Sequence, residues 1–142
     1  MAKVRKQSPP PVRPDARVAR RTASLRTFIE ALPRVESSTL SMGRTKAPVA
    51  LIHKIMGKMF AIQSLRGEDY VIVKCDPALI QVLRQQYKGV GHRSHLDKRF
   101  WIAVDLDSDV PIKEVRRLVG HSYGLVCAGL TRKQQAELAL KS

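Results

Sequence analysis

Short β-rich segments joined by short turns constrain the fold of this chain more than any other feature of its sequence. Three such segments follow one another, at residues 49–55, 58–64 and 70–74. Gly57 lies between the first two, and the turn-forming residues 66–69 lie between the second and the third. Connections this short join antiparallel neighbours, because a parallel pair needs a crossover of roughly a dozen residues or more. The pattern therefore predicts an antiparallel meander.

A further segment, residues 99–106, alternates regularly between two kinds of side chain. Every second position is apolar: Phe100, Ile102, Val104 and Leu106. The positions between them are mixed: Arg99, Trp101, Ala103 and Asp105. Successive side chains of a strand point to opposite faces of a sheet, so we expect the apolar set to face the core. Trp101 and Arg99 are then expected together on the opposite face.

One helix is expected before the meander and another after it. Residues 27–32 carry apolar side chains at helical spacing, and Pro33 ends this helix because proline lacks a backbone N–H. Asp76 and Pro77 open another helix, since aspartate accepts free N–H groups as an N-cap and proline suits the first helical position. Gly89 is expected to stop that helix.

The C-terminal part of the sequence indicates two more helices. Pro111 and Gly129 bound the longer one, in which apolar residues recur at near-heptad spacing. Thr131 and Gln134 have the spacing of a capping box, which predicts a last helix reaching about Leu140. Strands that come first and helices that come later indicate an α+β domain. We expect helices to cover one face of the antiparallel sheet and the other face to be at least partly open.

The positive charge is distributed unevenly along the chain. The net charge is +14, and residues 1–26 carry eight cations and one anion, hence half of it. Four of the eight prolines also fall in this segment, and large apolar residues are scarce. Such a segment buries too little apolar surface to offset the entropy of ordering. We therefore expect a flexible basic arm over 1–26, which either binds a partner or only keeps the chain in solution, and one folded domain over 27–142.

Composition narrows the class of protein further. A chain with 26 Lys and Arg against 12 Asp and Glu is strongly basic, and its natural partners are polyanions. It contains no run of about 18 apolar residues, so we expect no transmembrane helix and no membrane partner. The two cysteines, Cys75 and Cys127, are too few for a disulfide framework and indicate buried thiols in a cytoplasmic protein.

The motifs that resemble catalytic or metal sites are incomplete. Residues 120–124 (GHSYG) match GxSxG, but a nucleophile elbow needs a strand before the serine, and Ser122 falls on the apolar stripe of an expected helix. This position indicates a packed serine. His92 and His95 form an HxxH pair, whereas a zinc site needs three or four ligands. We therefore expect no enzyme activity, no metal and no cofactor.

The side chains suited to nucleic acid give a clearer signal. An aromatic ring with flanking cations on an open sheet can stack or wedge against bases while the cations meet phosphates. The candidate nucleic-acid-binding residues are Lys58, Lys74, Arg93, Lys98, Arg99 and Trp101. The alternative for Trp101 is that it covers a small second core beneath residues 89–98. The cations on the polar side of the long helix are typical of a solvated face: Lys113, Arg116 and Arg117.

An ordered set of short motifs resembles the MmcQ/YjbR family of small bacterial proteins. The motifs are GKMFA (57–61), VK (73–74) before a helix, HLDKRFW (95–101), HSYGLV (121–126) and AGLTRK (128–133). The resemblance covers residues 27–140. It implies a CyaY-like α+β fold of the double-wing type and a DNA-binding role without catalytic residues, so DNA rather than RNA is the expected nucleic acid.

Two departures from related proteins bear on this hypothesis. Many relatives carry asparagine where this chain has Asp97, and a carboxylate there argues against a phosphate contact at that position. The same fold occurs in frataxin, which binds iron through an acidic ridge, whereas residues 27–42 contain only Glu30 and Glu36. We therefore favour a DNA-binding protein, with a protein-interaction or small-anion-sensing domain as the alternative.

Overall fold

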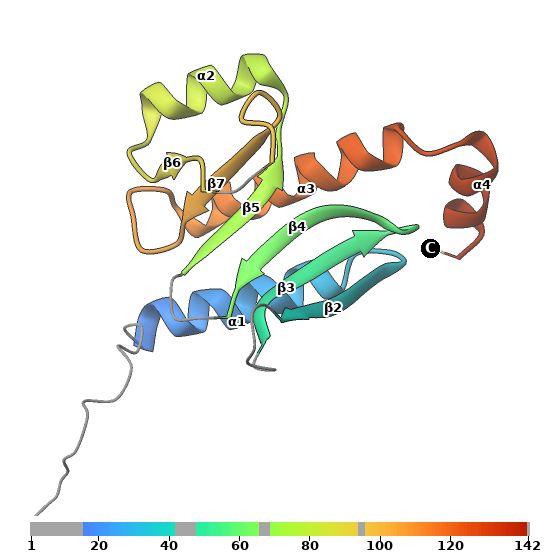
Figure 1. The fold of residues 1–142 in the computed structure, drawn as a ribbon, viewed down its shortest axis with the longest axis horizontal. Coiled ribbons are helices and arrows are strands. Elements are labelled where there is room, and N and C mark those ends of the chain that lie inside the picture. The colour runs from blue at the N-terminus through green and yellow to red at the C-terminus, as the bar shows by residue number, and fades with distance from the viewer. Residues whose placement is uncertain (1–15, 42–47, 66–68, 94–95, 142) are drawn as a thin grey trace, which may run out of the picture.

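The computed structural model describes residues 16–41, 48–65, 69–93 and 96–141, which form one six-stranded sheet and four helices (Figure 1). The strands are β2 (Val35–Ser41), β3 (Pro48–Ile55), β4 (Lys58–Ser64), β5 (Tyr70–Lys74), β6 (Val90–Gly91) and β7 (Trp101–Asp105). The helices are α1 (Ala16–Glu30), α2 (Pro77–Gln86), α3 (Ile112–Ala128) and α4 (Arg132–Lys141). The α+β prediction is confirmed. None of the helices in these ranges is long and apolar enough to span a bilayer.

The strands lie in the order β2-β3-β4-β5-β7-β6, and every neighbouring pair is antiparallel. Since the first four follow one another along the chain, the predicted meander is confirmed. After β5 the chain passes through α2, forms β6 at the edge and returns as β7 between β6 and β5. The two edge strands of the sheet therefore differ in length, because β2 has seven residues and β6 only two.

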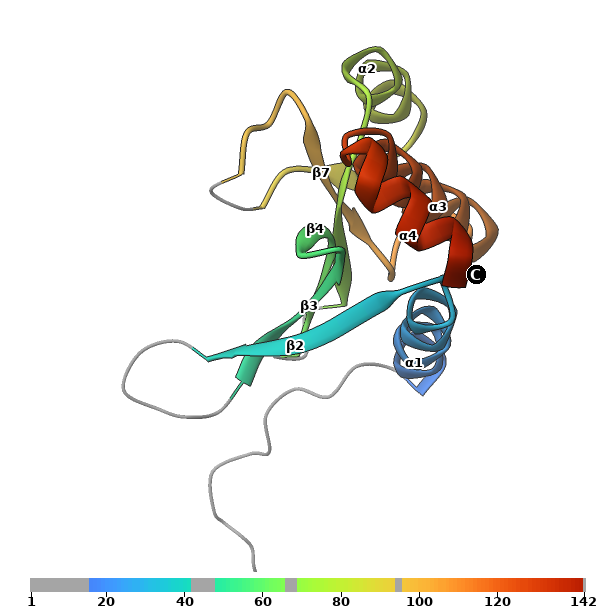
Figure 2. The same cartoon turned by 90° about the vertical axis from the view of Figure 1, so that its right-hand side faces the viewer.

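One face of the sheet packs against the helices. Alternate residues of the central strands β5 and β7 are buried on this side: Val71, Val73, Ile102 and Val104. Figure 2 shows α1, α3 and α4 on this side of the sheet, and α2 contributes Ile80 and Leu83 to the same core. Among the described residues, no helix covers the opposite side, which we call the open face.

Three of the predicted helix caps are present, whereas α2 ends at Gln86, before the expected stop at Gly89. The side chain of Asp76 accepts a hydrogen bond from the backbone N–H of Ala78 at 2.9 Å, and α3 ends at Gly129. At the start of α4, the hydroxyl of Thr131 accepts from the N–H of Gln134, whose side-chain oxygen accepts from the N–H of Thr131, both at 3.1 Å. These are the reciprocal bonds of a capping box. Local sequence therefore defines three of the helix ends.

The expected arm boundary at residue 26 is wrong, because α1 extends from Ala16 to Glu30. Leu25 and Ile29 in this helix are completely buried. They lie four residues apart, so one narrow apolar stripe attaches a segment that is otherwise basic. Arg21 also donates to the carbonyl oxygen of Leu106 at 2.9 Å. Residues 16–26 thus belong to the folded domain, while residues 1–15 lie outside the described residues.

One predicted core residue, Phe100, is 39% exposed. The strand begins only at Trp101, because the carbonyl oxygen of Asp97 accepts hydrogen bonds from the N–H groups of Phe100 and Trp101 and closes a turn there. The alternation holds from Ile102 onward, where the remaining apolar positions are buried as predicted. Ala103 on the other face is nearly buried as well.

Candidate nucleic-acid interface

A row of four apolar residues and one serine crosses the open face. Register pairs each of its members with the next across the strands: Ser38, Ile52, Ile62, Ile72 and Ala103. Ile72 and Ala103 point to the open side because their chain neighbours point into the core. Both are nearly buried, whereas Ile52 and Ile62 are half-buried. The open face therefore has an apolar floor, and the polar side chains stand around it.

Lys74 and Trp101 lie directly opposite each other on β5 and β7, at one side of this row. Both side chains are half-buried. Side chains of directly opposed residues have Cβ atoms roughly 4.5–5.5 Å apart, so the side chains of Lys74 and Trp101 leave the sheet as neighbours. The structure thus brings together two of the six candidate residues.

Ser122 of α3 supports the strand that carries Lys74. Its fully buried hydroxyl donates to the carbonyl oxygen of Phe60 at 2.6 Å and accepts from the N–H of Lys74 at 2.9 Å. The register of β4 with β5 ends at the pair of Ala61 and Val73. The hydroxyl therefore bridges the two strands just beyond their last direct pair. The prediction of a packed helical serine is confirmed.

Arg93 lies on the open face at the other end of β5. Its guanidinium carbon lies 4.9 Å from the ring centroid of Tyr70, which is opposite Asp105 in β7. A cavity of about 210 Å³ adjoins this pair and is lined in part by Lys88, His92 and Arg93. Its lining is mostly polar and does not include Trp101. This differs from a closed apolar pocket with Trp101 in its wall, which would favour a small-molecule ligand at this place.

Lys98 and Arg99 are exposed in the turn before β7. The guanidinium of Arg99 binds both carboxylate oxygens of Asp97, at 2.7–3.1 Å, and lies 5.4 Å from the ring centroid of Phe100. Hydrogen bonds from the Arg99 side chain and then from its backbone N–H lower the pKa of Asp97 to about 2. Asp97 therefore remains charged and neutralises much of the charge of Arg99, which weakens the case for a phosphate contact there.

Lys58 does not belong to this surface. It is paired with Ile55, a fully buried core residue, so its side chain points to the helix face. Its ammonium group donates to the carbonyl oxygen of Gly129 at 3.4 Å, at the end of α3. The expected grouping of Lys58 with Lys74 is therefore wrong, because strand position alone did not define which face each lysine occupies.

Two open-face residues were not predicted. Lys54 follows the core residue His53 and precedes the core residue Ile55, so it points to the open side, where it is half-buried. Tyr70 carries the ring under Arg93. The alternation of residues 51–55 contained the signal for Lys54. No local signal links Tyr70 with Arg93, since the contact depends on the path of the chain between β6 and β7.

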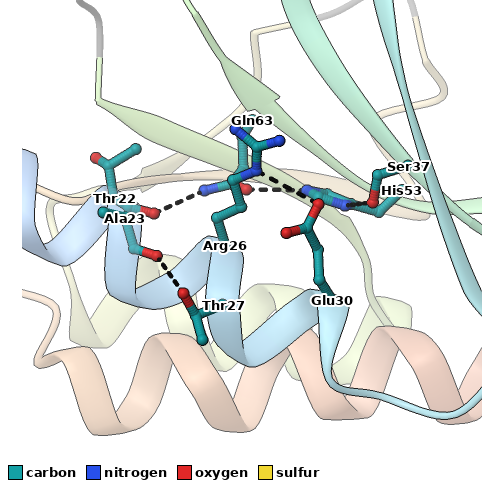
Figure 3. A network of polar contacts seen from close by, with 8 residues as sticks. All are labelled: Thr22, Ala23, Arg26, Thr27, Glu30, Ser37, His53 and Gln63. Carbon is teal, nitrogen blue, oxygen red and sulfur yellow. Dashed lines mark hydrogen bonds and ion pairs between the residues drawn. The ribbon is translucent and has the colours of Figure 1, made fainter.

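Figure 3 shows a separate polar network between α1 and the helix face of the sheet. The side-chain N–H of Gln63 donates to the carbonyl oxygen of Thr22 at 3.2 Å, which turns the Gln63 oxygen toward Nε2 of His53 at 2.9 Å. That oxygen only accepts, so His53 carries its proton on Nε2, and Nδ1 accepts from the hydroxyl of Ser37 at 2.7 Å. Burial lowers the pKa of His53 and keeps its ring neutral. The network attaches α1 to the sheet.

The described fold defines a class of small α+β domains with helices on one face of an antiparallel sheet and an open second face. The sequence of this region also matches the model of a known protein family. The chain belongs to the YjbR family, whose model matches residues 30–125, more than half of the chain. The resemblance found in the sequence is thereby confirmed. Most of α1 precedes the matched residues.

Relatives and solved structures agree with this assignment. Uncharacterized protein YbdF of Escherichia coli O157:H7 is 32% identical over 85 residues, covering 59% of this chain and 70% of that protein. Uncharacterized protein YjbR of E. coli K12 is 34% identical over 71 residues, covering 49% and 60%. The crystal structure of Deinococcus radiodurans protein DR2400, with domain DUF419, has a TM-score of 0.70 and 27% identity, covering 82% of this chain and 86% of that chain. A Pseudomonas syringae crystal structure shares the fold alone, with a TM-score of 0.57, 20% identity and coverage of 72% and 96%.

Proposed function

We propose that this protein binds DNA through its open face and does so without catalysis. The observation that carries the proposal is the adjacency of Lys74 and Trp101, together with Arg93 on the ring of Tyr70. An indole ring beside a cation suits stacking or wedging against bases while the cation meets a phosphate. The net charge of +14 favours the same partner, because it attracts polyanions over a distance.

The spacing of these groups also suits a nucleic-acid strand. Tyr70 and Lys74 occupy the two ends of β5, four residues apart, which is roughly 13 Å along a strand. Groups at the two ends of β5 can therefore contact one nucleic-acid strand at two separate points of its backbone. We expect contacts of this kind to give affinity without sequence preference.

The cysteines support a cytoplasmic location within this proposal. Cys75 and Cys127 are both free thiols. Burial raises the pKa of Cys75 to about 11, so this thiol is unreactive. Free thiols persist in a reducing compartment, which is where a bacterial DNA-binding protein works.

The test is a titration of the full chain with duplex and with single-stranded DNA at several salt concentrations. Trp101 is the only tryptophan, so quenching of its fluorescence reports contact at the proposed surface directly. We expect binding at about 50 mM salt that weakens as salt rises, with log K falling by about 0.9 per phosphate contacted on duplex. Absence of binding at low salt would overturn the proposal.

A matched pair of lysine variants locates the surface. Lys74→Gln and Lys58→Gln remove the same charge, but only Lys74 lies on the open face. We expect Lys74→Gln to reduce the salt slope by about 0.9 and Lys58→Gln to leave it unchanged. Equal effects of the two variants would mean that only overall charge matters. The contribution of the N-terminal segment is tested by removing residues 1–15, since α1 begins at Ala16.

A further inference from the structure

A second cavity lies on the helix side of the molecule, away from the open face. Its volume is about 590 Å³, within the range of roughly 300–1,000 Å³ typical of small-molecule sites. Residues of α1, of the end of α2 and of the first two turns of α3 line it. They include Phe28, Tyr87, Lys113, Glu114, Arg116 and Arg117. None of these lies on a strand, so the cavity is distinct from the proposed DNA surface.

The cavity is positively charged. Three cations, Lys113, Arg116 and Arg117, line it against one carboxylate, that of Glu114, which leaves a net charge of +2. Glu114 is already engaged, because it accepts hydrogen bonds from Arg117 and, at 3.3 Å, from the hydroxyl of Tyr87. The lining therefore favours an anion. The sequence indicated only a solvated face for the three cations, which are indeed exposed, but they border a concave surface.

Neighbouring side chains hold both guanidinium groups in place. Arg116 donates to the hydroxyl of Ser24 at 2.8 Å and lies 5.9 Å from the ring centroid of Phe28. Arg117 donates through Nε to Glu114. A guanidinium has five N–H donors, so each arginine has further donors for a ligand. Because the groups are positioned in advance, binding costs less side-chain entropy.

Two aromatic side chains and Pro111 complete the lining. Phe28 of α1 and Tyr87 at the end of α2 contribute rings to the same cavity. Aromatic walls favour a flat ring, and fixed arginines favour a phosphate or carboxylate. We propose that this cavity binds a small organic anion that carries a flat ring, of the size and chemistry of a nucleotide.

The test is isothermal titration calorimetry of the full chain with adenosine monophosphate, adenosine and inorganic phosphate. Adenosine carries the ring alone and phosphate the anion alone. We expect the monophosphate to bind at least about tenfold more tightly than either fragment, because only it uses the aromatic walls and the arginines together. Equal affinity for the monophosphate and inorganic phosphate would overturn the proposal.

Matched variants distinguish this site from general charge and from the DNA surface. Arg117→Gln and Lys113→Gln should each weaken the monophosphate by about tenfold or somewhat less, as expected for loss of a charge-assisted hydrogen bond. Arg84→Gln removes an exposed arginine of α2 outside the cavity and should change nothing. Weakening by Arg84→Gln equal to that by Arg117→Gln, or loss of binding in Lys74→Gln, would place the nucleotide elsewhere and refute the assignment. The outcome of this test does not affect the DNA-binding proposal, since Arg117→Gln leaves the open face intact.

Discussion

Replacing Ser122 with alanine removes the buried hydroxyl that bridges β4 and β5. The N–H of Lys74 loses its acceptor and the carbonyl oxygen of Phe60 loses a donor. Ser122 is completely buried, so bulk water does not substitute for the missing oxygen. A buried polar group left unpaired costs about 1–3 kcal/mol. With two such groups, one of them only partly buried, we expect Ser122→Ala to lower the free energy of unfolding by about 2–4 kcal/mol, a large share of the roughly 5–15 kcal/mol that stabilises a domain.

Urea denaturation followed by circular dichroism measures this loss. The matched control is Ser38→Ala, which removes an exposed hydroxyl of β2 and should change the free energy of unfolding by no more than about 0.5 kcal/mol. If Ser122→Ala costs as little as this control, with an unchanged denaturant slope, the bridging role assigned to the hydroxyl is refuted. The fluorescence of Trp101 in the same samples shows whether the β5–β7 surface rearranges.

Three further predictions concern α1, α2 and the buried histidine. Leu25→Ala should lower the free energy of unfolding by about 2–5 kcal/mol in a urea titration; a loss below about 1 kcal/mol would mean that α1 does not pack as described. Asp76→Ala should cost about 1 kcal/mol through loss of the α2 cap, read from the thermal midpoint, and no shift would contradict the capping bond. Because burial holds the pKa of His53 below its ordinary 6.5, the unfolded chain binds more protons between those two values. Stability should thus be full above about pH 6.5 and fall as pH drops toward the folded pKa; a His53→Gln variant with the same pH dependence would exclude His53 as the cause.

Much of the fold followed from local sequence. The segments predicted as 58–64 and 70–74 coincide with β4 and β5, and the caps at Asp76 and Gln134 form the bonds expected of them. These features depend on a few adjacent residues, so a single sequence contains the information. Phe100 shows the limit, because a turn built on Asp97 overrode the apolar alternation at its first position.

The candidate site depended more on tertiary structure. Trp101 and Lys74 were both predicted, but their adjacency comes from the register of β5 with β7, which 26 intervening residues leave open. Lys58 was placed with them and lies on the other face, whereas Lys54 was overlooked and lies on the open one. In both cases the strand itself was predicted, but the face of the sheet that the lysine side chain occupies was not.

By itself, the sequence determined most of the helices and strands, the antiparallel connections of the meander and the large positive charge. Tertiary structure alone decided that α1 joins the domain through Leu25 and that cations of α3 border a cavity. It also decided that both ring nitrogens of His53 in β3 find hydrogen-bond partners, one on β2 and one on β4. The physical reason is that periodicity and capping act over one or two turns of chain. Register and side-chain partners instead depend on packing between segments distant in sequence, which is settled only when the whole core forms.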